Sequence, residues 1–267
     1  MYLHNKKISV VVSDFDGTII KPGMLTPPAR FFENVEKLIA KGIPFIAASG
    51  RQYANLRRIL SPIADKIDFI AENGCLVIHN DKIIHKSIIP WEIEKELLTD
   101  LQKHPEGEIA VSGADTLYLC TKNTWFIDLM QNKVKNNVTV VDSFDSIEDD
   151  IIKTSILWTT GIPEEPEKWF HEKYDLKLSV ANGGNGWLDF NPLNSSKGAA
   201  LRVLSECIGI PTSEMIAFGD NENDIAMLKE AGISYAVSTA LPHVKEVCDY
   251  ICENVEDIME EMIKTSP

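Results

Sequence analysis

The stretch Lys7-Ile8-Ser9-Val10-Val11-Val12-Ser13-Asp14-Phe15-Asp16-Gly17-Thr18-Ile19-Ile20 decides the fold class. Its first half is a β-branched apolar run, which predicts a strand that is buried on both faces of a parallel sheet. The run ends at two carboxylates, and open α/β sheets bind ligands just beyond the carboxyl ends of their strands. We therefore expect Asp14 and Asp16 at the edge of the sheet where an active site forms. Gly17 allows the backbone to turn tightly there, and Thr18 adds a hydroxyl group.

The composition is that of a globular protein with a core of its own. The chain has 267 residues, of which 44% are hydrophobic and 25% charged. No apolar run approaches the roughly 20 residues of a membrane span, and the first apolar run is too short for a signal peptide, so we expect a cytoplasmic protein. The five cysteines are scattered and predict neither a disulfide framework nor a zinc site. The composition does not predict the oligomeric state.

The net charge of −14 argues against nucleic acid as a partner. An anionic substrate would have to be held by local positive charge. A bound cation, a lysine or the N-terminus of a helix can supply that charge.

The order of the predicted elements indicates two domains. Strands and helices alternate at both ends of the chain, with strands expected at residues 44–48, 69–71, 215–218 and 234–237. Thr26 is predicted to cap the first helix. Between residues 85 and 191 the strands group in an antiparallel pattern, with helices near Pro90 and Pro166. This predicts an α/β, Rossmann-like parallel-sheet core from residues 1–84 and 192–267, with an α+β cap domain inserted at residues 85–191.

Polar residues cluster at four places where an apolar strand ends or a helix begins. The clusters are Asp14/Asp16/Thr18, Ser49/Gly50/Arg51, Lys197 and Asp220/Asn223/Asp224. In a parallel sheet such positions meet along one edge, so we expect the four clusters to converge.

Converging carboxylates predict a bound cation. Each like-charge pair costs on the order of 4 kcal/mol at about 4 Å and an effective dielectric constant near 20. Oxygen ligands without histidine or cysteine favour Mg²⁺. Together with a lysine, hydroxyl groups and backbone amides, Mg²⁺ fits phosphoryl transfer, in which an aspartate can also be the nucleophile.

Each cluster taken alone has a simpler interpretation. Asp14 and Asp16 would fit an exposed turn, Lys197 a surface lysine, and Asp220–Asp224 a helix cap. The presence of all four clusters favours the catalytic interpretation. The glycine-rich segment 182–186 is interpreted as a hairpin turn, and Trp187 beside it as a candidate pocket residue.

The chain resembles the haloacid dehalogenase superfamily, specifically its Cof-like capped phosphatases. The resemblance covers nearly the whole chain and includes Glu72-Asn73-Gly74. Its four motifs occur here in order, as Asp14-Phe15-Asp16-Gly17-Thr18, Ser49-Gly50-Arg51, Ser196-Lys197-Gly198 and Gly219-Asp220-Asn221-Glu222-Asn223-Asp224.

The resemblance implies a role for each motif residue. Asp14 would be the nucleophile and Asp16 the general acid and base. Mg²⁺ would be held by a carboxylate oxygen of Asp14, the backbone carbonyl of Asp16 and Asp220, with Asp224 supporting from nearby.

The resemblance also implies a site for the phosphoryl group of the substrate. Its oxygens would be bound by Ser49, the Gly50 amide, Lys197 and Asn223. Thr18 would order the loop of this phosphate site.

The expected activity is Mg²⁺-dependent hydrolysis of small phosphorylated metabolites through an aspartyl-phosphate, with sugar phosphates the most favoured substrates. One alternative is a phosphotransferase or phosphomutase that passes the phosphoryl group to a second hydroxyl. Another is a phospho-accepting regulator, although receiver domains are about half as long and lack an inserted lid.

Overall fold

The computed structural model describes residues 1–265 of the chain. Contacts within the chain divide it into two compact units. The first unit comprises Met1–Arg51, Leu56–His85 and the segment from Ser196 to the C-terminus, and the second comprises Gln52–Asn55 and Lys86–Ser195. The sequence prediction places the boundaries after residues 84 and 191, and does not assign residues 52–55 to the second unit.

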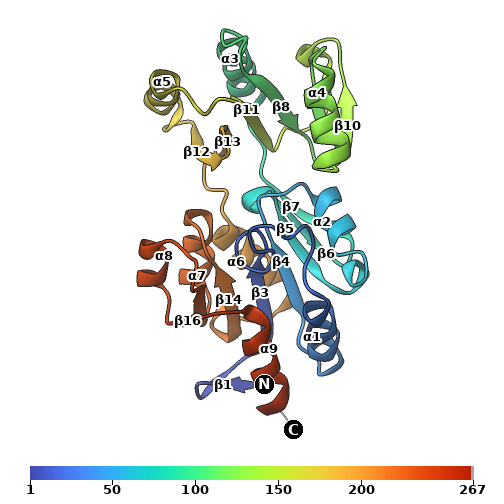
Figure 1. The fold of residues 1–267 in the computed structure, drawn as a ribbon, viewed down its shortest axis with the longest axis vertical. Coiled ribbons are helices and arrows are strands. Elements are labelled where there is room, and N and C mark those ends of the chain that lie inside the picture. The colour runs from blue at the N-terminus through green and yellow to red at the C-terminus, as the bar shows by residue number, and fades with distance from the viewer. Residues whose placement is uncertain (266–267) are drawn as a thin grey trace. The chain divides into compact units, whose positions relative to one another are not determined.

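The first unit is built around one large sheet flanked by helices, and its first two strands form a separate two-stranded antiparallel sheet (Figure 1). Its strands are β1 (Tyr2–Leu3), β2 (Lys6–Lys7), β3 (Val10–Asp14), β4 (Phe45–Ala48), β5 (Asp68–Ala71), β6 (Leu76–His79), β7 (Lys82–Lys86), β14 (Met215–Gly219), β15 (Ile233–Val237) and β16 (Tyr250–Cys252). Its helices are α1 (Ala29–Ala40), α6 (Lys197–Ile208), α7 (Ile225–Glu230), α8 (Pro242–Val247) and α9 (Val255–Thr265), together with α2 (Tyr53–Ile59), whose first three residues belong to the second unit.

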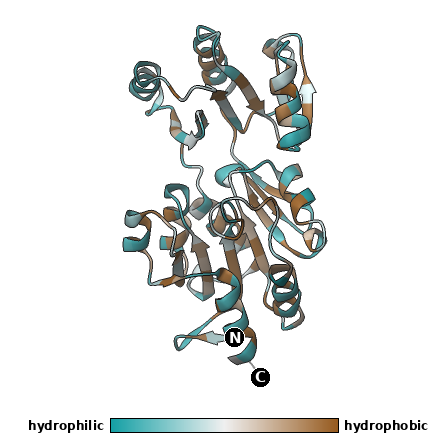
Figure 2. Cartoon of the chain, in the orientation of Figure 1, coloured by the Kyte–Doolittle hydropathy of each residue, from teal (hydrophilic) through white to brown (hydrophobic). Residues whose placement is uncertain are grey.

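The main sheet has eight strands in the order β16-β15-β14-β3-β4-β5-β6-β7. The strands from β16 to β5 are parallel, and β6 runs antiparallel to β5. Every residue of β3, β4, β5, β14 and β15 is buried. Because successive side chains point to opposite faces of a sheet, both faces are covered. Hydrophobic colouring along these strands marks the core (Figure 2), and the predicted α/β parallel-sheet core is confirmed.

The first helix begins later than predicted. Helix α1 starts at Ala29, with Pro28 at the N-cap in an extended conformation and no side chain capping the helix, so the prediction that Thr26 is the cap is wrong. The physical reason is the pair of prolines, because a residue that precedes a proline is disfavoured in the helical region. Thr26 and Pro27 each precede a proline, so the helix begins after both of them.

The second unit is an α+β structure with its own sheet. The strands are β8 (Glu108–Ser112), β9 (Leu117–Leu119), β10 (Val138–Val140), β11 (Lys153–Leu157), β12 (Leu178–Gly184) and β13 (Trp187–Pro192), in the sheet order β10-β9-β8-β11-β13-β12. All neighbouring pairs are antiparallel except β9 and β10. The helices are α3 (Trp91–Leu101), α4 (Thr124–Asp128) and α5 (Glu164–Tyr174).

Both faces of this second sheet carry apolar side chains. Ile156 and Leu157 are consecutive residues of β11, yet they belong to different buried clusters. Ile156 packs in the cluster that contains Phe170 of α5, whereas Leu157 packs in the cluster that contains Phe126 of α4. The turn between β12 and β13 is a hairpin, as predicted for residues 182–186.

Within residues 1–265, no helix combines the length and the apolar character needed to cross a membrane.

Candidate active site

The candidate site lies where three parallel strands of the first unit end together. In β3, Asp14 is paired with Ala48 of β4, and Ser13 is paired with Phe218 of β14. The segments that leave these strands therefore start at the same edge of the sheet. This register brings the motif segments after β3, β4 and β14 together, as their sequence positions predict.

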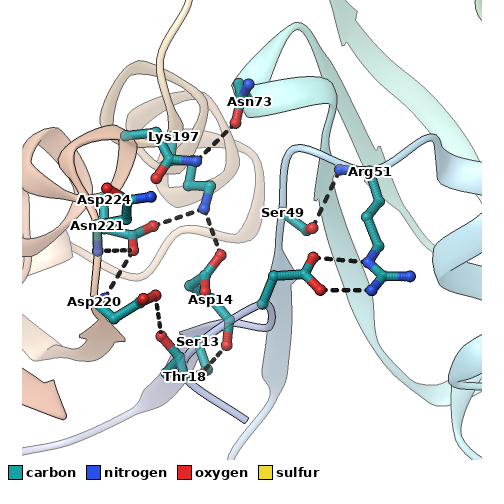
Figure 3. A network of polar contacts seen from close by, with 12 residues as sticks. Ser13, Asp14, Thr18, Ser49, Arg51, Asn73, Lys197, Asp220, Asn221 and Asp224 are labelled. Carbon is teal, nitrogen blue, oxygen red and sulfur yellow. Dashed lines mark hydrogen bonds and ion pairs between the residues drawn. The ribbon is translucent and has the colours of Figure 1, made fainter. Parts of the chain in front are cut away.

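Lys197 lies at the centre of the site and joins two carboxylates (Figure 3). Its Nζ donates hydrogen bonds of 2.6 Å to Asp14 Oδ1 and 2.6 Å to Asp224 Oδ1. The exposed fractions are 0% for Lys197 and Asp224 and 4% for Asp14, so the simpler interpretation of Lys197 as a surface lysine is wrong. Lys197 is the first residue of α6, where a positive charge opposes the helix dipole. The carboxylates of Asp14 and Asp224 compensate for this unfavourable interaction with the helix dipole.

Asp220 is held beside Asp14 by the turn that follows β3. Thr18 Oγ1 donates a 2.9 Å hydrogen bond to Asp220 Oδ1. Gly17 has a φ of +93°, and a Cβ at this position would lie 2.1 Å from Asp220 Oδ2. Only glycine therefore satisfies both the backbone conformation and the close approach of the carboxylate.

Asp224 connects the loop after β14 to the lysine. Its Oδ2 accepts hydrogen bonds from the backbone amides of Asp220 at 2.9 Å and Asn221 at 3.1 Å, while its Oδ1 accepts from Lys197. Helix capping therefore explains the position of Asp224 Oδ2. It explains neither the position of Asp220 nor the contact between Asp224 and Lys197.

The electrostatics of the cluster favour an additional positive charge. Burial, followed by repulsion from Asp224, raises the pKa of Asp14 well above its ordinary value, against the attraction of Lys197. Burial and Asp224 likewise raise the pKa of Asp220. Burial alone would lower the pKa of Lys197, but the attraction of Asp14 and Asp224 and its hydrogen bonds with both raise it overall. One ammonium group thus faces three carboxyl groups.

The acidic cluster has the donor set of a divalent cation site. Asp14, Asp220 and Asp224 each offer a carboxylate oxygen, and these oxygens all lie within 4.8 Å of one another. Within residues 1–265, the buried Asp14 Oδ2 has no hydrogen-bond partner. A buried anionic oxygen without a partner is costly unless a cation neutralises it. An all-oxygen donor set of this kind suits Mg²⁺.

The carboxylate of Asp16 lies outside this cluster and is paired with an arginine. It accepts hydrogen bonds from Arg51 Nε at 2.7 Å and from Arg51 Nη2 at 2.5 Å, which is a two-point guanidinium–carboxylate pair. Arg51 is part of a predicted motif, but no role was assigned to it from the sequence, because nothing in the motif indicates which carboxylate it contacts.

Three predicted phosphate-site residues, Ser49, Gly50 and Asn223, follow the ends of β4 and β14 in the first unit. Ser49 is fully buried, and its Oγ accepts a 3.2 Å hydrogen bond from the backbone amide of Arg51. Asn223 Nδ2 donates a 2.9 Å hydrogen bond to Asn73 Oδ1. A Cβ on Gly50 would lie 2.8 Å from the same Asn73 Oδ1. Asn73 was not predicted as a site residue, and the only sequence signal was its place in the segment Glu72-Asn73-Gly74.

Residues 11–260 match a family described as haloacid dehalogenase-like hydrolase. The chain belongs to this family.

Relatives of this haloacid dehalogenase-like hydrolase are phosphatases. It is 30% identical to the 5-amino-6-(5-phospho-D-ribitylamino)uracil phosphatase YbjI of Escherichia coli, over 96% of this chain and 97% of the relative. It is 25% identical to the phosphatase YcsE of Bacillus subtilis, which carries the same activity name, over 96% of this chain and 95% of the relative. The structure of the subclass IIB sugar phosphatase BT4131 superposes with a TM-score of 0.81 at 24% identity, and the alignment covers 95% of this chain and 98% of the chain in that structure.

These comparisons confirm three predictions from the sequence. The family and the fold class are those expected, and the chain is an enzyme, a phosphatase of the haloacid dehalogenase-like hydrolase family.

Proposed function

We propose that this hydrolase cleaves a small phosphomonoester in two steps through an aspartyl-phosphate on Asp14. The observation that carries the proposal is the buried Asp14 at the end of β3, which contacts Lys197 and lies in one cluster with Asp220 and Asp224. Two-step covalent catalysis divides a very slow hydrolysis into two easier reactions.

In the first step Asp14 is the nucleophile. A carboxylate oxygen of Asp14 attacks the phosphorus, the bond between phosphorus and the leaving oxygen breaks, and the leaving alcohol takes a proton from Asp16. In the second step water attacks the phosphorus of the aspartyl-phosphate and gives a proton to Asp16, while Asp14 is released together with inorganic phosphate. Lys197 Nζ, which contacts Asp14 at 2.6 Å, stabilises negative charge at the reacting centre.

Asp16 must move for this role. Its carboxylate is paired with Arg51 through two hydrogen bonds in the structure. The pair is partly exposed, with 30% of the Arg51 side chain and 48% of the Asp16 side chain accessible, so solvent and salt screen it. In the proposed mechanism a contact with the leaving group replaces this pair.

The acidic cluster would hold Mg²⁺ through Asp14, the backbone carbonyl of Asp16 and Asp220, with Asp224 in support. When bound, the metal ion would supply positive charge that offsets the repulsion among the carboxylates and the charge of the phosphoryl group. The support for this assignment is the all-oxygen donor set and the buried Asp14 Oδ2 without a hydrogen-bond partner among residues 1–265.

The phosphoryl oxygens would be bound by Ser49, the Gly50 amide, Lys197 and Asn223. Thr18, which is bonded to Asp220, would order the loop. The second unit, residues 86–195 with residues 52–55, would act as the cap that excludes water and selects the substrate.

For the substrate we propose a phosphorylated sugar or sugar alcohol. The support is the activity named for two relatives, which act on a ribityl phosphate that is linked to a pyrimidine. Sugar phosphates and this ribityl phosphate share a phosphomonoester on a polyhydroxylated carbon chain, so they belong in one substrate class.

A substrate panel tests the proposal. The purified protein is incubated with Mg²⁺ and with 5-amino-6-(5-phospho-D-ribitylamino)uracil, pentose phosphates, hexose phosphates or nucleoside monophosphates, and phosphate release is measured. We expect sustained turnover, with the highest kcat/KM in the polyol or sugar group. Release limited to one equivalent per protein would contradict hydrolysis, and a clear preference for nucleotides would contradict the substrate class.

A further inference from the structure

The segment Glu72–Gly74 is a strained turn that the proposed function leaves without a role. It follows β5, and its three residues all have positive φ values, +49° for Glu72, +57° for Asn73 and +97° for Gly74. Left-handed backbone is unfavourable for residues other than glycine, although asparagine tolerates it better than most. Consecutive residues in this conformation persist only where the surroundings hold them, and such strain is common at functional sites.

Two of the proposed phosphate-site segments hold the backbone of this turn. The Asn73 amide donates to the Ser49 carbonyl at 3.0 Å, and the Glu72 amide donates to the Arg51 carbonyl at 3.1 Å. On the other side, a Cβ on Gly74 would lie 2.3 Å from the carbonyl oxygen of Ser196, which caps α6. The turn therefore fills the space between the loop after β4 and the start of α6.

The side chain of Asn73 lies beside two proposed phosphate ligands, Asn223 and Gly50. Its Oδ1 accepts the 2.9 Å hydrogen bond from Asn223 Nδ2, which lies 150 residues away in sequence. A Cβ on Gly50 would lie 2.8 Å from Asn73 Oδ1 and 3.3 Å from its Cγ and Nδ2. One amide group thus lies against Gly50 and bonds to Asn223.

We propose that Asn73 is a positioning residue that orients the Asn223 amide toward the phosphoryl group, an inference that rests on the proposed function. An amide nitrogen carries two N–H donors, so Asn223 can give one to Asn73 and offer the other to an anion. If the Asn223 amide turned over, its Oδ1 would face Asn73 Oδ1 and the two oxygens would repel each other. The contact therefore keeps the donor side of Asn223, rather than its oxygen, available for a phosphoryl oxygen.

A double-mutant cycle tests this coupling. Asn73→Gly removes the amide but keeps a residue that accepts a positive φ, and Asn223→Ala removes the group it orients. The affinity for inorganic phosphate with Mg²⁺ is measured by calorimetry, and kcat/KM is measured with p-nitrophenyl phosphate. In the natural protein, we expect Asn73→Gly to lower the phosphate affinity and kcat/KM by about tenfold each, which is the loss typical of one hydrogen bond to a ligand. In the Asn223→Ala background, the same substitution should lower each by less than about twofold.

Asn80→Gly is the matched control. Asn80 also has a positive φ, +50°, and its amide also bonds to another side chain, that of His79. The same substitution there is expected to change neither phosphate affinity nor kcat/KM. A second readout is independent of turnover: the NMR signals of the Asn223 side-chain NH₂ group, assigned by their loss in Asn223→Ala, should shift in Asn73→Gly and stay in place in Asn80→Gly.

Equal losses from Asn73→Gly in both backgrounds would overturn the proposal, since Asn73 would then act independently of Asn223. An unchanged phosphate affinity in Asn73→Gly would overturn it as well. If the natural protein bound phosphate but released none from esters, only the proposed hydrolysis would be refuted. The double-mutant cycle, measured by phosphate affinity, would still test the role of Asn73. A natural protein that neither binds phosphate nor hydrolyses esters would refute both.

Discussion

At the scale of single residues, Lys197 allows buried carboxylates to lie close together. Its Nζ contacts Asp14 and Asp224 at 2.6 Å each, and all three side chains are almost completely buried. Removing Lys197 would leave both buried carboxylates without compensation, which is far more costly than breaking a surface ion pair. The same contacts place an ammonium group beside the proposed nucleophile.

The first prediction concerns Asp14. Asp14→Asn should lower kcat/KM on the order of 10³-fold or more, because an amide cannot form the aspartyl-phosphate. The free energy of unfolding should not fall, because burial and repulsion from Asp224 already raise the pKa of Asp14 and so disfavour its charged form. Phosphate release and chemical denaturation measure the two effects. Asp65→Asn, at a side chain that is 84% exposed, is the control, and normal turnover by Asp14→Asn would refute the nucleophile assignment.

Asp16 has a separate test that depends on the leaving group. If Asp16 protonates the leaving alcohol, Asp16→Asn should lower kcat/KM for an alkyl phosphate by about 10² to 10⁴-fold. An ester of 2,4-dinitrophenol needs little protonation, so its kcat/KM should fall much less. Kinetics with a series of esters of graded leaving-group pKa measure the difference. Equal losses across the series would show that Asp16 does not act as the general acid.

At the scale of elements, the ends of β3, β4 and β14 determine which side chains meet. The register pairs Asp14 with Ala48 and Ser13 with Phe218, so the loops that follow start level with one another. The turn after β3 must then leave room for Asp220. Gly17 meets this requirement through its positive φ and its missing side chain.

Gly17→Ala should therefore disrupt the site more than an ordinary glycine substitution. The new Cβ would lie 2.1 Å from Asp220 Oδ2, so Asp220 must move away from Asp14. Gly23→Ala is the matched control, because Gly23 has a similar φ of +87° and no atom within 4 Å of an added Cβ. Both variants should lose roughly 1–2 kcal/mol of stability from the backbone strain, but only Gly17→Ala should lose most of its activity. Similar activities in the two variants would contradict the argument.

Helix α3 carries a buried acid that predicts a pH effect on stability. Glu94 is fully buried and accepts a 2.7 Å hydrogen bond from Thr154 Oγ1. Burial raises the pKa of Glu94 from 4.5 to about 7, although the hydrogen bond from Thr154 lowers it in part. Between these values the folded protein binds more protons than the unfolded chain, so stability falls as the pH rises.

Glu94→Gln removes this titration. The free energy of unfolding of the natural protein, relative to that of Glu94→Gln, should fall by about 2 kcal/mol between pH 5.5 and pH 8. Denaturation of both proteins across this range measures the difference. Glu92→Gln, at an exposed position of the same helix, should show no comparable trend. A constant difference between the natural protein and Glu94→Gln would mean that Glu94 does not titrate in this range.

At the scale of the whole molecule, the proposed metal site joins the two ends of the chain. Asp14 comes from the N-terminal segment, and Asp220 and Asp224 come from the segment after residue 196. A cation that binds only the folded protein stabilises it, by about 2.7 kcal/mol at a free concentration of 100 times Kd. The site therefore links the folding of both segments to the metal.

Removal and return of Mg²⁺ test this link. EDTA should abolish phosphate release and lower the Tm, and added Mg²⁺ should restore both. In Asp220→Asn the increase in Tm with Mg²⁺ should disappear, whereas Asp65→Asn should keep it. Full activity in excess EDTA, or an equal increase in the Tm of Asp220→Asn, would contradict the assignment of the metal ligands.

Local sequence patterns predict the fold class and most of the residues that gather at the site. Apolar runs identify the buried parallel strands, and the geometry of a parallel sheet then brings the residues after β3, β4 and β14 to one edge. Elements without such a run, such as β1, β2, β16 and α4, were not predicted, because short segments carry little periodicity.

The contacts between individual side chains depend on the tertiary structure. The two-point pair of Asp16 with Arg51 spans 35 residues, and the bond of Asn223 to Asn73 spans 150 residues. The burial of Lys197 and the unpartnered oxygen of Asp14 likewise depend on how the loops pack. The physical reason is that strand formation follows from local hydrophobic patterning, whereas a side-chain hydrogen bond requires distances and directions that are set by the packing of distant segments.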